Sequence, residues 1–263
     1  VAMGRYGGRE CSYASDADVI ALHEAVGGAT EAEVAASATA IVNRVKNLLG
    51  SATNQLGIVV DLDLRPEGKN GPMSRTIESH REYAQRWAST WERQAAVRAR
   101  PIGEGSLADS ARALFDELAY GGVSESDVRD IRLLKARMEN ERLPRGIEPA
   151  RHVKLGPGGL TDVEWTIQLI QMRAGMNNPA LRTPSTTQAI LSARENALIS
   201  AQDAQTLLDA WDMATRIRAA NTLASGRMSG VKLDVLPRDS ADLRALAAIL
   251  GYGSGGLNAL EDD

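Results

Sequence analysis

Three aspartates near the start of the chain lie in two stretches that we expect to form strands. Asp16 and Asp18 are one residue apart and precede an apolar run, and Asp61 lies in a later segment of alternating apolar and charged residues. Side chains alternate along a strand, so Asp16 and Asp18 share one face, where their charges repel unless a cation lies between them. Mg²⁺ prefers such oxygen ligands, usually together with substrate phosphates. The three residues predict a two-metal site for displacement at phosphorus, although Asp-x-Asp also occurs at solvated strand ends.

A pair of glycines precedes these aspartates. Gly7 and Gly8 have no side chains, so backbone N–H groups there can approach phosphate oxygens closely. A Gly-Gly pair is also common in ordinary turns. The order of the glycines, the Asp-x-Asp pair and a second acidic strand favours nucleotidyl transfer over these simpler interpretations.

Short elements of both types must position these residues. Residues 1–5 and 16–22 are expected to form strands, and 57–65 alternates with a period of two. The apolar face of that last strand comprises Val60, Leu62 and Leu64, and its charged face Asp61, Asp63 and Arg65. Residues 31–49 have the spacing of an amphipathic helix. Its apolar stripe comprises Val34, Ala38, Ile41, Val45 and Leu48.

Helical spacing dominates the rest of the chain. Residues 76–100 are expected to form one helix, with Trp87 and Trp91 in the core rather than stacked on an adenine ring. Thr161 and Glu164 have the spacing of a capping box at the start of a helix. Glycine and proline separate the further helices, predicted at 107–119, 124–141, 161–175, 186–194, 200–223 and 239–250.

Composition limits the class of protein. The 263 residues contain 43% hydrophobic and 4% aromatic residues, which favours helices packed through small aliphatic side chains. A net charge of −4 argues against bulk nucleic acid as a partner. The single cysteine, Cys11, cannot form an internal disulfide, and the sequence has no signal peptide or membrane-spanning run, so we expect a cytoplasmic protein. The apolar start suggests a fragment that is truncated at its N-terminus.

Four sequence blocks resemble the nucleotidyltransferase domain of bacterial glutamine synthetase adenylyltransferase. They are GRYGGRECSYASDADVI, DLDLRPEGKNGP, STWERQAAVRAR and KLGPGGLTDVEWTIQLIQM, in family order between residues 3 and 172. The resemblance implies an α+β fold, with a polymerase-beta-like mixed-sheet catalytic domain at 1–103 and an all-α helical domain at 104–263. Family members have two such halves, one attaching AMP and one removing it. The residues at 90–95 and 161–164 resemble those of the half that attaches AMP.

The resemblance also implies a reaction and roles for residues. AMP would pass from ATP to a tyrosine of glutamine synthetase with release of pyrophosphate, in a Mg²⁺-dependent reaction that a PII-type signalling protein would regulate. Asp16 and Asp18 would bind the metal. Asp61 would complete the second metal site or accept the proton of the tyrosine. The triphosphate would be lined by Gly7, Gly8 and Ser15. Independently of the resemblance, Arg98 is a candidate to neutralise the pyrophosphate, because a guanidinium suits phosphate oxygens, although a cation at a helix end is also stabilising without any ligand.

Some alternatives stay open. Asp63 could join the site, pair with Arg65 or face solvent, and we favour Asp61 for catalysis and an ion pair for Asp63. The chain could instead remove AMP by phosphorolysis. It could also be a nucleotide-binding module that is inactive as a fragment.

Overall fold

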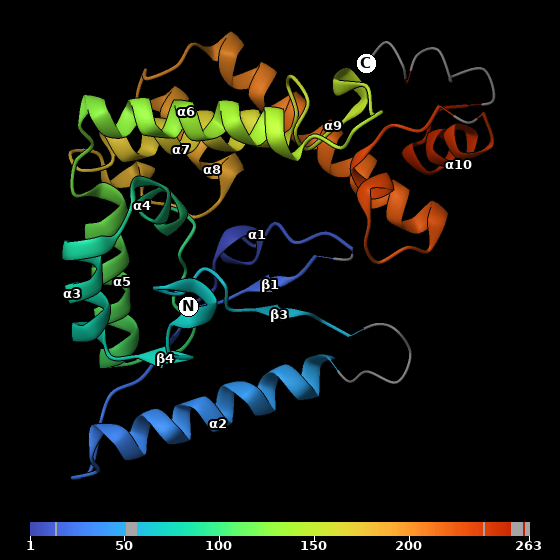
Figure 1. Cartoon of the computed structure of the whole chain (residues 1–263). Coiled ribbons are helices and arrows are strands. Elements are labelled where there is room, and N and C mark those ends of the chain that lie inside the picture. The colour runs from blue at the N-terminus through green and yellow to red at the C-terminus, as the bar shows by residue number, and fades with distance from the viewer. Residues whose placement is uncertain (14, 51–56, 239, 254–259, 261–263) are drawn as a thin grey trace. The chain divides into compact units, whose positions relative to one another are not determined.

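The computed structural model describes residues 1–13, 15–50, 57–238, 240–253 and 260. The chain has the predicted α+β class, in which short strands, paired in parallel rather than in the predicted mixed sheet, are followed mostly by helices (Figure 1). The described residues form two compact units. Unit 1 comprises Val1–Cys11, Ser15–Val128 and Gln168–Ser192, and unit 2 comprises Ser12–Ala14, Arg129–Ile167 and Ala193–Asp263. The domain boundary near residue 103 stays a prediction.

The described part of unit 1 contains two separate two-stranded parallel sheets. Strand β1 (Ala17–Asp18) pairs with β3 (Val60–Asp61), and β2 (Ala21–Leu22) pairs with β4 (Ser74–Arg75). Ala2 adds isolated antiparallel bridges to Val19 and Arg100. The remainder of the predicted strand at 1–5 is wrong, because Gly4 adopts a φ of +51° and begins the short helix α1 (Gly4–Gly7).

The predicted strand at 57–65 is much shorter than expected. Only Val60–Asp61 is extended in a ladder, because the backbone turns at Leu62–Arg65 before Pro66. The two predicted faces are nevertheless confirmed where they matter for packing. Val60 and Leu62 are buried, whereas Asp61 is half-buried and Asp63 is exposed.

Helix α2 (Glu31–Gly50) is confirmed, but most of its apolar stripe is not covered. A capping box between Thr30 and Glu33 starts the helix, and α2 packs against β2, β3 and β4 (Figure 1). A 20-residue helix is about 30 Å long, which far exceeds strands of two residues. Consequently Ile41, Val45 and Leu48 are exposed in the described part of the chain.

The predicted helix at 76–100 is two helices, α3 (Ile77–Trp87) and α4 (Thr90–Ala96). A capping box between Ser89 and Glu92 starts α4 and breaks the helical spacing between the two tryptophans. The prediction of a core position for both is wrong: Trp87 is 74% exposed and Trp91 is 42% exposed.

The later helices agree with their predicted ranges to within two residues. They are α5 (Ser106–Tyr120), α6 (Glu125–Arg142), α7 (Leu160–Ala174), α8 (Thr186–Glu195), α9 (Ala201–Ser225) and α10 (Ser240–Leu250). The predicted start of the last one, residue 239, lies outside the described residues. Because α7 already begins at Leu160, Thr161 lies in the first turn and does not form the predicted cap; its hydroxyl donates to the Lys154 carbonyl at 2.8 Å.

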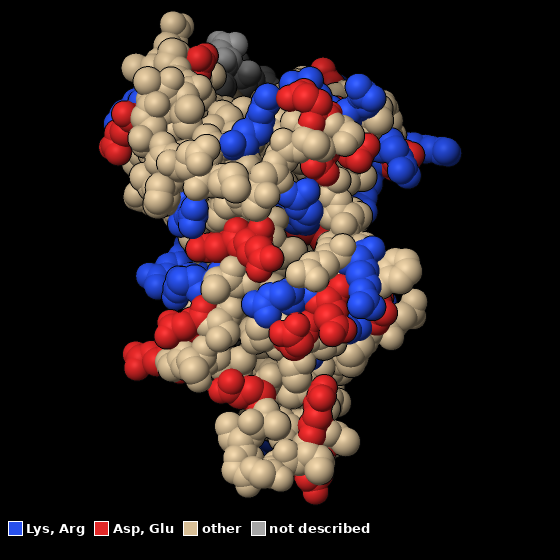
Figure 2. Space-filling view, turned by 90° about the vertical axis from the view of Figure 1, so that its left-hand side faces the viewer, with Lys and Arg blue, Asp and Glu red and all other residues tan. Residues whose placement is uncertain are grey.

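Unit 2 has its own apolar core between α9 and α10. The buried side chains are Ile217, Ala220, Leu243, Leu246, Ala247 and Leu260. Among the described residues, every helix is too short or too polar to span a lipid bilayer. On the face drawn in Figure 2, basic and acidic side chains are interspersed.

Candidate active site

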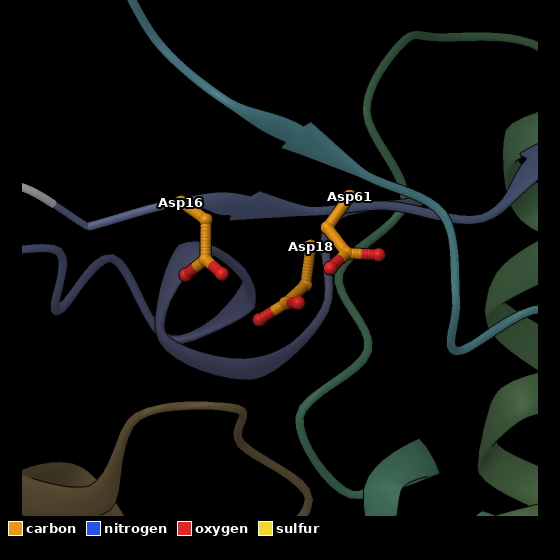
Figure 3. A group of neighbouring side chains, drawn as sticks. All are labelled: Asp16, Asp18 and Asp61. Atoms are coloured by element: carbon orange, nitrogen blue, oxygen red, sulfur yellow. The ribbon is translucent and has the colours of Figure 1, made fainter. Parts of the chain in front are cut away.

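The three predicted aspartates converge at the β1–β3 ladder. Asp18 and Asp61 are directly paired in the parallel register, and Asp16 immediately precedes β1. One carboxylate oxygen from each of Asp16, Asp18 and Asp61 lies within 4.8 Å of the others. Figure 3 shows all three side chains on the same side of the two strands. The structure thus brings together residues that are separated by more than forty positions in the sequence.

The donor set of this cluster fits a hard divalent cation. Asp16 is exposed, and Asp18 and Asp61 are half-buried, so solvent and solutes reach the carboxylates. One oxygen of Asp61 accepts the backbone N–H of Asp63 at 2.6 Å, which fixes the orientation of that carboxylate. Three like charges this close favour a bound cation, and oxygen ligands suit Mg²⁺.

Asp63 forms ion pairs instead of joining the cluster. Its carboxylate lies 3.8 Å from Arg65 Nη1 and 3.3 Å from Lys69 Nζ. The Arg65 guanidinium also donates to the carbonyls of Leu62 and Gly71, which holds the turn after β3. The predicted ion pair of Asp63 with Arg65 is confirmed.

The glycines beside the cluster are required by close packing. An added Cβ at Gly7 would lie 1.8 Å from the Arg98 carbonyl oxygen, and one at Gly4 would lie 2.5 Å from Asp18 Oδ2. The backbone N–H groups of Gly7 and Gly8 donate to the carbonyls of Met3 and Gly4. The predicted triphosphate contacts of these glycines and of half-buried Ser15 stay predictions. Gly4 was not predicted, although it is the first glycine of the GRYGG block.

Arg98 is buried beneath the glycine segment, with 4% of the residue exposed. Its Nη2 lies 2.7 Å from Glu10 Oε2, its Nε donates to the Gly4 carbonyl at 3.1 Å, and its Nη1 donates to Thr186 Oγ1. All three guanidinium nitrogens therefore have protein partners. The predicted contact between Arg98 and phosphate stays a prediction.

Comparisons with known proteins cover nearly the whole chain. A glutamate-ammonia ligase adenylyltransferase model matches residues 1–114, which include every predicted site residue, and a GlnD PII-uridylyltransferase model matches residues 132–262. A bifunctional glutamine synthetase adenylyltransferase/adenylyl-removing enzyme from Streptomyces coelicolor is 44% identical over 266 residues, covering 100% of this chain and 26% of the relative. The proteins of the same name from Cutibacterium acnes and Mycobacterium marinum are 45% and 40% identical, covering 26% and 25% of those relatives.

The chain is similar to one segment of these bifunctional glutamine synthetase adenylyltransferase/adenylyl-removing enzymes. It spans about a quarter of the length of these relatives. The convergent aspartates lie within the part of the chain that the adenylyltransferase model matches.

Three further residues from the family-like blocks make contacts that were not predicted. Glu10 pairs with Arg98, and Gln94 donates a hydrogen bond of 2.8 Å to Gln168. Both glutamine side chains are buried, and the two residues, which belong to different blocks, are 74 positions apart in the sequence. The sequence did hold a signal for this pair, because Gln94 and Gln168 are polar residues within otherwise apolar helical patterns. Buried polar side chains need hydrogen-bond partners.

Proposed function

We propose that this chain transfers AMP from ATP to a tyrosine of glutamine synthetase and releases pyrophosphate. The observation that carries the proposal is the convergence of Asp16, Asp18 and Asp61 on two paired strands. The name of the similar proteins supports glutamine synthetase as the acceptor protein. The sequence of residues 90–95 and 161–164, which resembles the attaching half, supports attachment rather than removal of AMP.

In the proposed reaction, the tyrosine oxygen attacks the α-phosphorus of ATP. A bond forms between that oxygen and the α-phosphorus, and the bond to the bridging oxygen of the β-phosphate breaks. Bound Mg²⁺ would activate the attacking oxygen and stabilise the leaving pyrophosphate. Asp16 and Asp18 would hold the metal, and Asp61 would complete the second metal site or accept the tyrosine proton.

Asp61 and Asp63 have different contacts in and after β3, and we assign them different roles. The Asp63 N–H orients the Asp61 carboxylate, and the Asp63 carboxylate is held by Lys69 and Arg65. The Gly4–Gly8 segment would shape the place for the triphosphate beside Asp18, together with Ser15. A PII-type regulator and a cytoplasmic location complete the proposal. The regulator rests on the resemblance alone, and the location rests on the single cysteine and on the lack of a membrane-spanning run in the sequence.

The test is transfer of label from α-labelled ATP to glutamine synthetase in the presence of Mg²⁺. We expect transfer by the unmodified chain and its loss in Asp16→Asn and Asp18→Asn. Asp63→Asn is the matched control, because it removes the same charge from a carboxylate held in ion pairs beside the site. Equal loss in Asp63→Asn would contradict the assignment.

Two further arms decide between the alternatives. Incubation with AMP-modified glutamine synthetase and inorganic phosphate tests removal, and release of ADP there would show that the wrong half was assigned. ATP binding in a calorimeter without any transfer would show a nucleotide-binding module that has lost turnover.

A further inference from the structure

Glu10 and Arg98 form a buried ion pair beside the candidate active site. The distance from Arg98 Nη2 to Glu10 Oε2 is 2.7 Å, and only 5% and 13% of the two side chains are exposed. A charge-assisted bond in such surroundings is strong, and removal of either partner leaves the other charge buried and uncompensated. Neither residue is among the three aspartates that converge at the strands.

The guanidinium end of this pair holds the segment that contacts Asp18. Arg98 Nε donates to the Gly4 carbonyl, and an added Cβ at Gly8 would lie 2.8 Å from Arg98 Nη2. Gly4 itself lies so close to Asp18 that its own added Cβ would be 2.5 Å from Oδ2. Gly4 therefore contacts the Arg98 guanidinium through its carbonyl and lies close to the Asp18 carboxylate.

The carboxylate end of the pair is fixed by the first turn of α8. Glu10 Oε1 accepts the Thr186 backbone N–H at 2.6 Å and the Ser185 hydroxyl at 3.1 Å. Glu10 Oε2 accepts the Thr186 hydroxyl at 3.1 Å, and the same hydroxyl accepts from Arg98. Glu10 thus satisfies a backbone donor at a helix start that has no local partner for it.

We infer that Glu10, Arg98 and Thr186 are positioning residues, which hold the Gly4–Gly8 segment against Asp18 and thereby set the geometry of the metal-binding aspartates. This inference rests on the proposed function for the role of the aspartates. Residues that orient metal ligands typically change metal affinity or activity by about 10- to 100-fold when they are replaced. Arg98 would orient the site, because its three guanidinium nitrogens already have partners within the protein.

The test compares Glu10→Gln and Thr186→Val with a matched control, Asp127→Asn. Glu10→Gln removes the charge with little change of shape, and Thr186→Val removes only the hydroxyl that joins the pair to α8. Asp127 is also a partly buried carboxylate that pairs with an arginine, Arg93, and accepts a backbone N–H at a helix start, that of Ser124. Asp127 therefore reports the general cost of losing such a contact in unit 1.

Two measurements separate positioning from general stability. Titration of Mn²⁺, followed by electron paramagnetic resonance, measures metal affinity without turnover. We expect Glu10→Gln to weaken Mn²⁺ binding and to lower kcat for AMP transfer by about 10- to 100-fold, with a smaller change in KM for ATP. Asp127→Asn should lose as much thermal stability as Glu10→Gln and still bind Mn²⁺ with unchanged affinity.

Hydrogen exchange on the metal-free chain gives the second measurement. Glu10→Gln and Thr186→Val should speed exchange in peptides that cover residues 3–10 and 183–190, and Asp127→Asn should not. Unchanged exchange and unchanged Mn²⁺ affinity in Glu10→Gln would overturn the inference. Absence of Mn²⁺ binding to the unmodified chain would overturn the proposed function, and the exchange data would still decide whether Glu10 fixes the glycine segment.

Discussion

Gln94 on α4 and Gln168 on α7 share a buried hydrogen bond of 2.8 Å, from the amide nitrogen of Gln94 to the amide oxygen of Gln168. Replacement of Gln168 by Leu leaves the Gln94 donor buried without an acceptor, which typically costs about 1–3 kcal/mol. We expect the double variant Gln94→Leu/Gln168→Leu to lose less stability than the sum of the single variants. Urea unfolding in a double-mutant cycle measures this coupling.

The control for that cycle is Gln85→Leu on α3, since Gln85 is exposed. Its free energy of unfolding should stay within about 0.5 kcal/mol of the unmodified chain. Strictly additive single changes at Gln94 and Gln168 would show that the hydrogen bond does not couple the two helices.

The aspartate cluster predicts a response of stability to divalent cations. A cation bound to the folded cluster would relieve the repulsion between its carboxylates, so Mg²⁺ should raise the thermal midpoint and a chelator should reverse the rise. Asp16→Asn should raise the midpoint without metal and abolish most of the response. Differential scanning fluorimetry measures both effects.

Asp63→Asn supplies the contrast for the metal response. It removes ion pairs with Arg65 and Lys69 from an exposed turn, so we expect a small change in stability and a normal response to Mg²⁺. If Asp63→Asn lost the response to Mg²⁺ while Asp16→Asn kept it, the cation would not bind at the assigned carboxylates.

His80 predicts a loss of stability in acid. Burial, with a smaller contribution from the charge of Arg75, lowers the pKa of His80 from 6.5 to about 4. Between these values the unfolded chain binds a proton that the folded chain does not, so stability falls as the pH drops through this range. The full difference corresponds to about 3 kcal/mol, reached near pH 4.

The measurement is urea unfolding at pH 7, 5.5 and 4 for the unmodified chain and for His80→Leu. The variant keeps an apolar contact with Phe115, whose ring centroid lies 5.3 Å from that of His80. Its stability should fall less steeply between pH 6.5 and 4. Identical slopes in both proteins would rule out His80 as the titrating group.

Gly7 predicts a large effect of a single methyl group. Gly7→Ala would place Cβ 1.8 Å from the Arg98 carbonyl, a rigid backbone atom, so the segment must shift at a cost of about 1–3 kcal/mol. Gly50→Ala is the matched control, because its added Cβ meets nothing within 4 Å. Thermal unfolding should separate the two variants, and equal midpoints would contradict the close packing at Gly7.

The sequence predicted the helices from Ser106 onward well and the sheet poorly. Long periodic segments with glycine and proline between them define helices locally, and α9 begins at the cap of Ser200 and ends at Gly226 in a left-handed conformation. The strands depend on partners far along the chain, so an alternating pattern at 57–65 could not reveal a ladder of two residues. Trp87 and Trp91 were misplaced because a capping box at Ser89 interrupts the helical period.

The candidate site shows the same division between local and distant information. The spacing of Asp16 and Asp18 was sufficient to predict a shared face, and the resemblance to a known family singled out Asp61 within the acidic strand at 61–63. Nothing local to Glu10 indicated its contact with Thr186, which lies 176 residues away. Such a contact depends on how separate helices and strands pack, which single-sequence patterns do not contain.

The distance along the chain between Glu10 and Thr186 has a consequence for the order of folding during synthesis. The aspartates and glycines are translated before α8, and the helix start that fixes Glu10 is translated 176 residues after Glu10 itself. Until α8 emerges, Glu10 and Arg98 have no access to the Thr186 donors that complete their network. The nascent chain therefore cannot assemble the complete site until translation has passed Thr186, however early the strands are made.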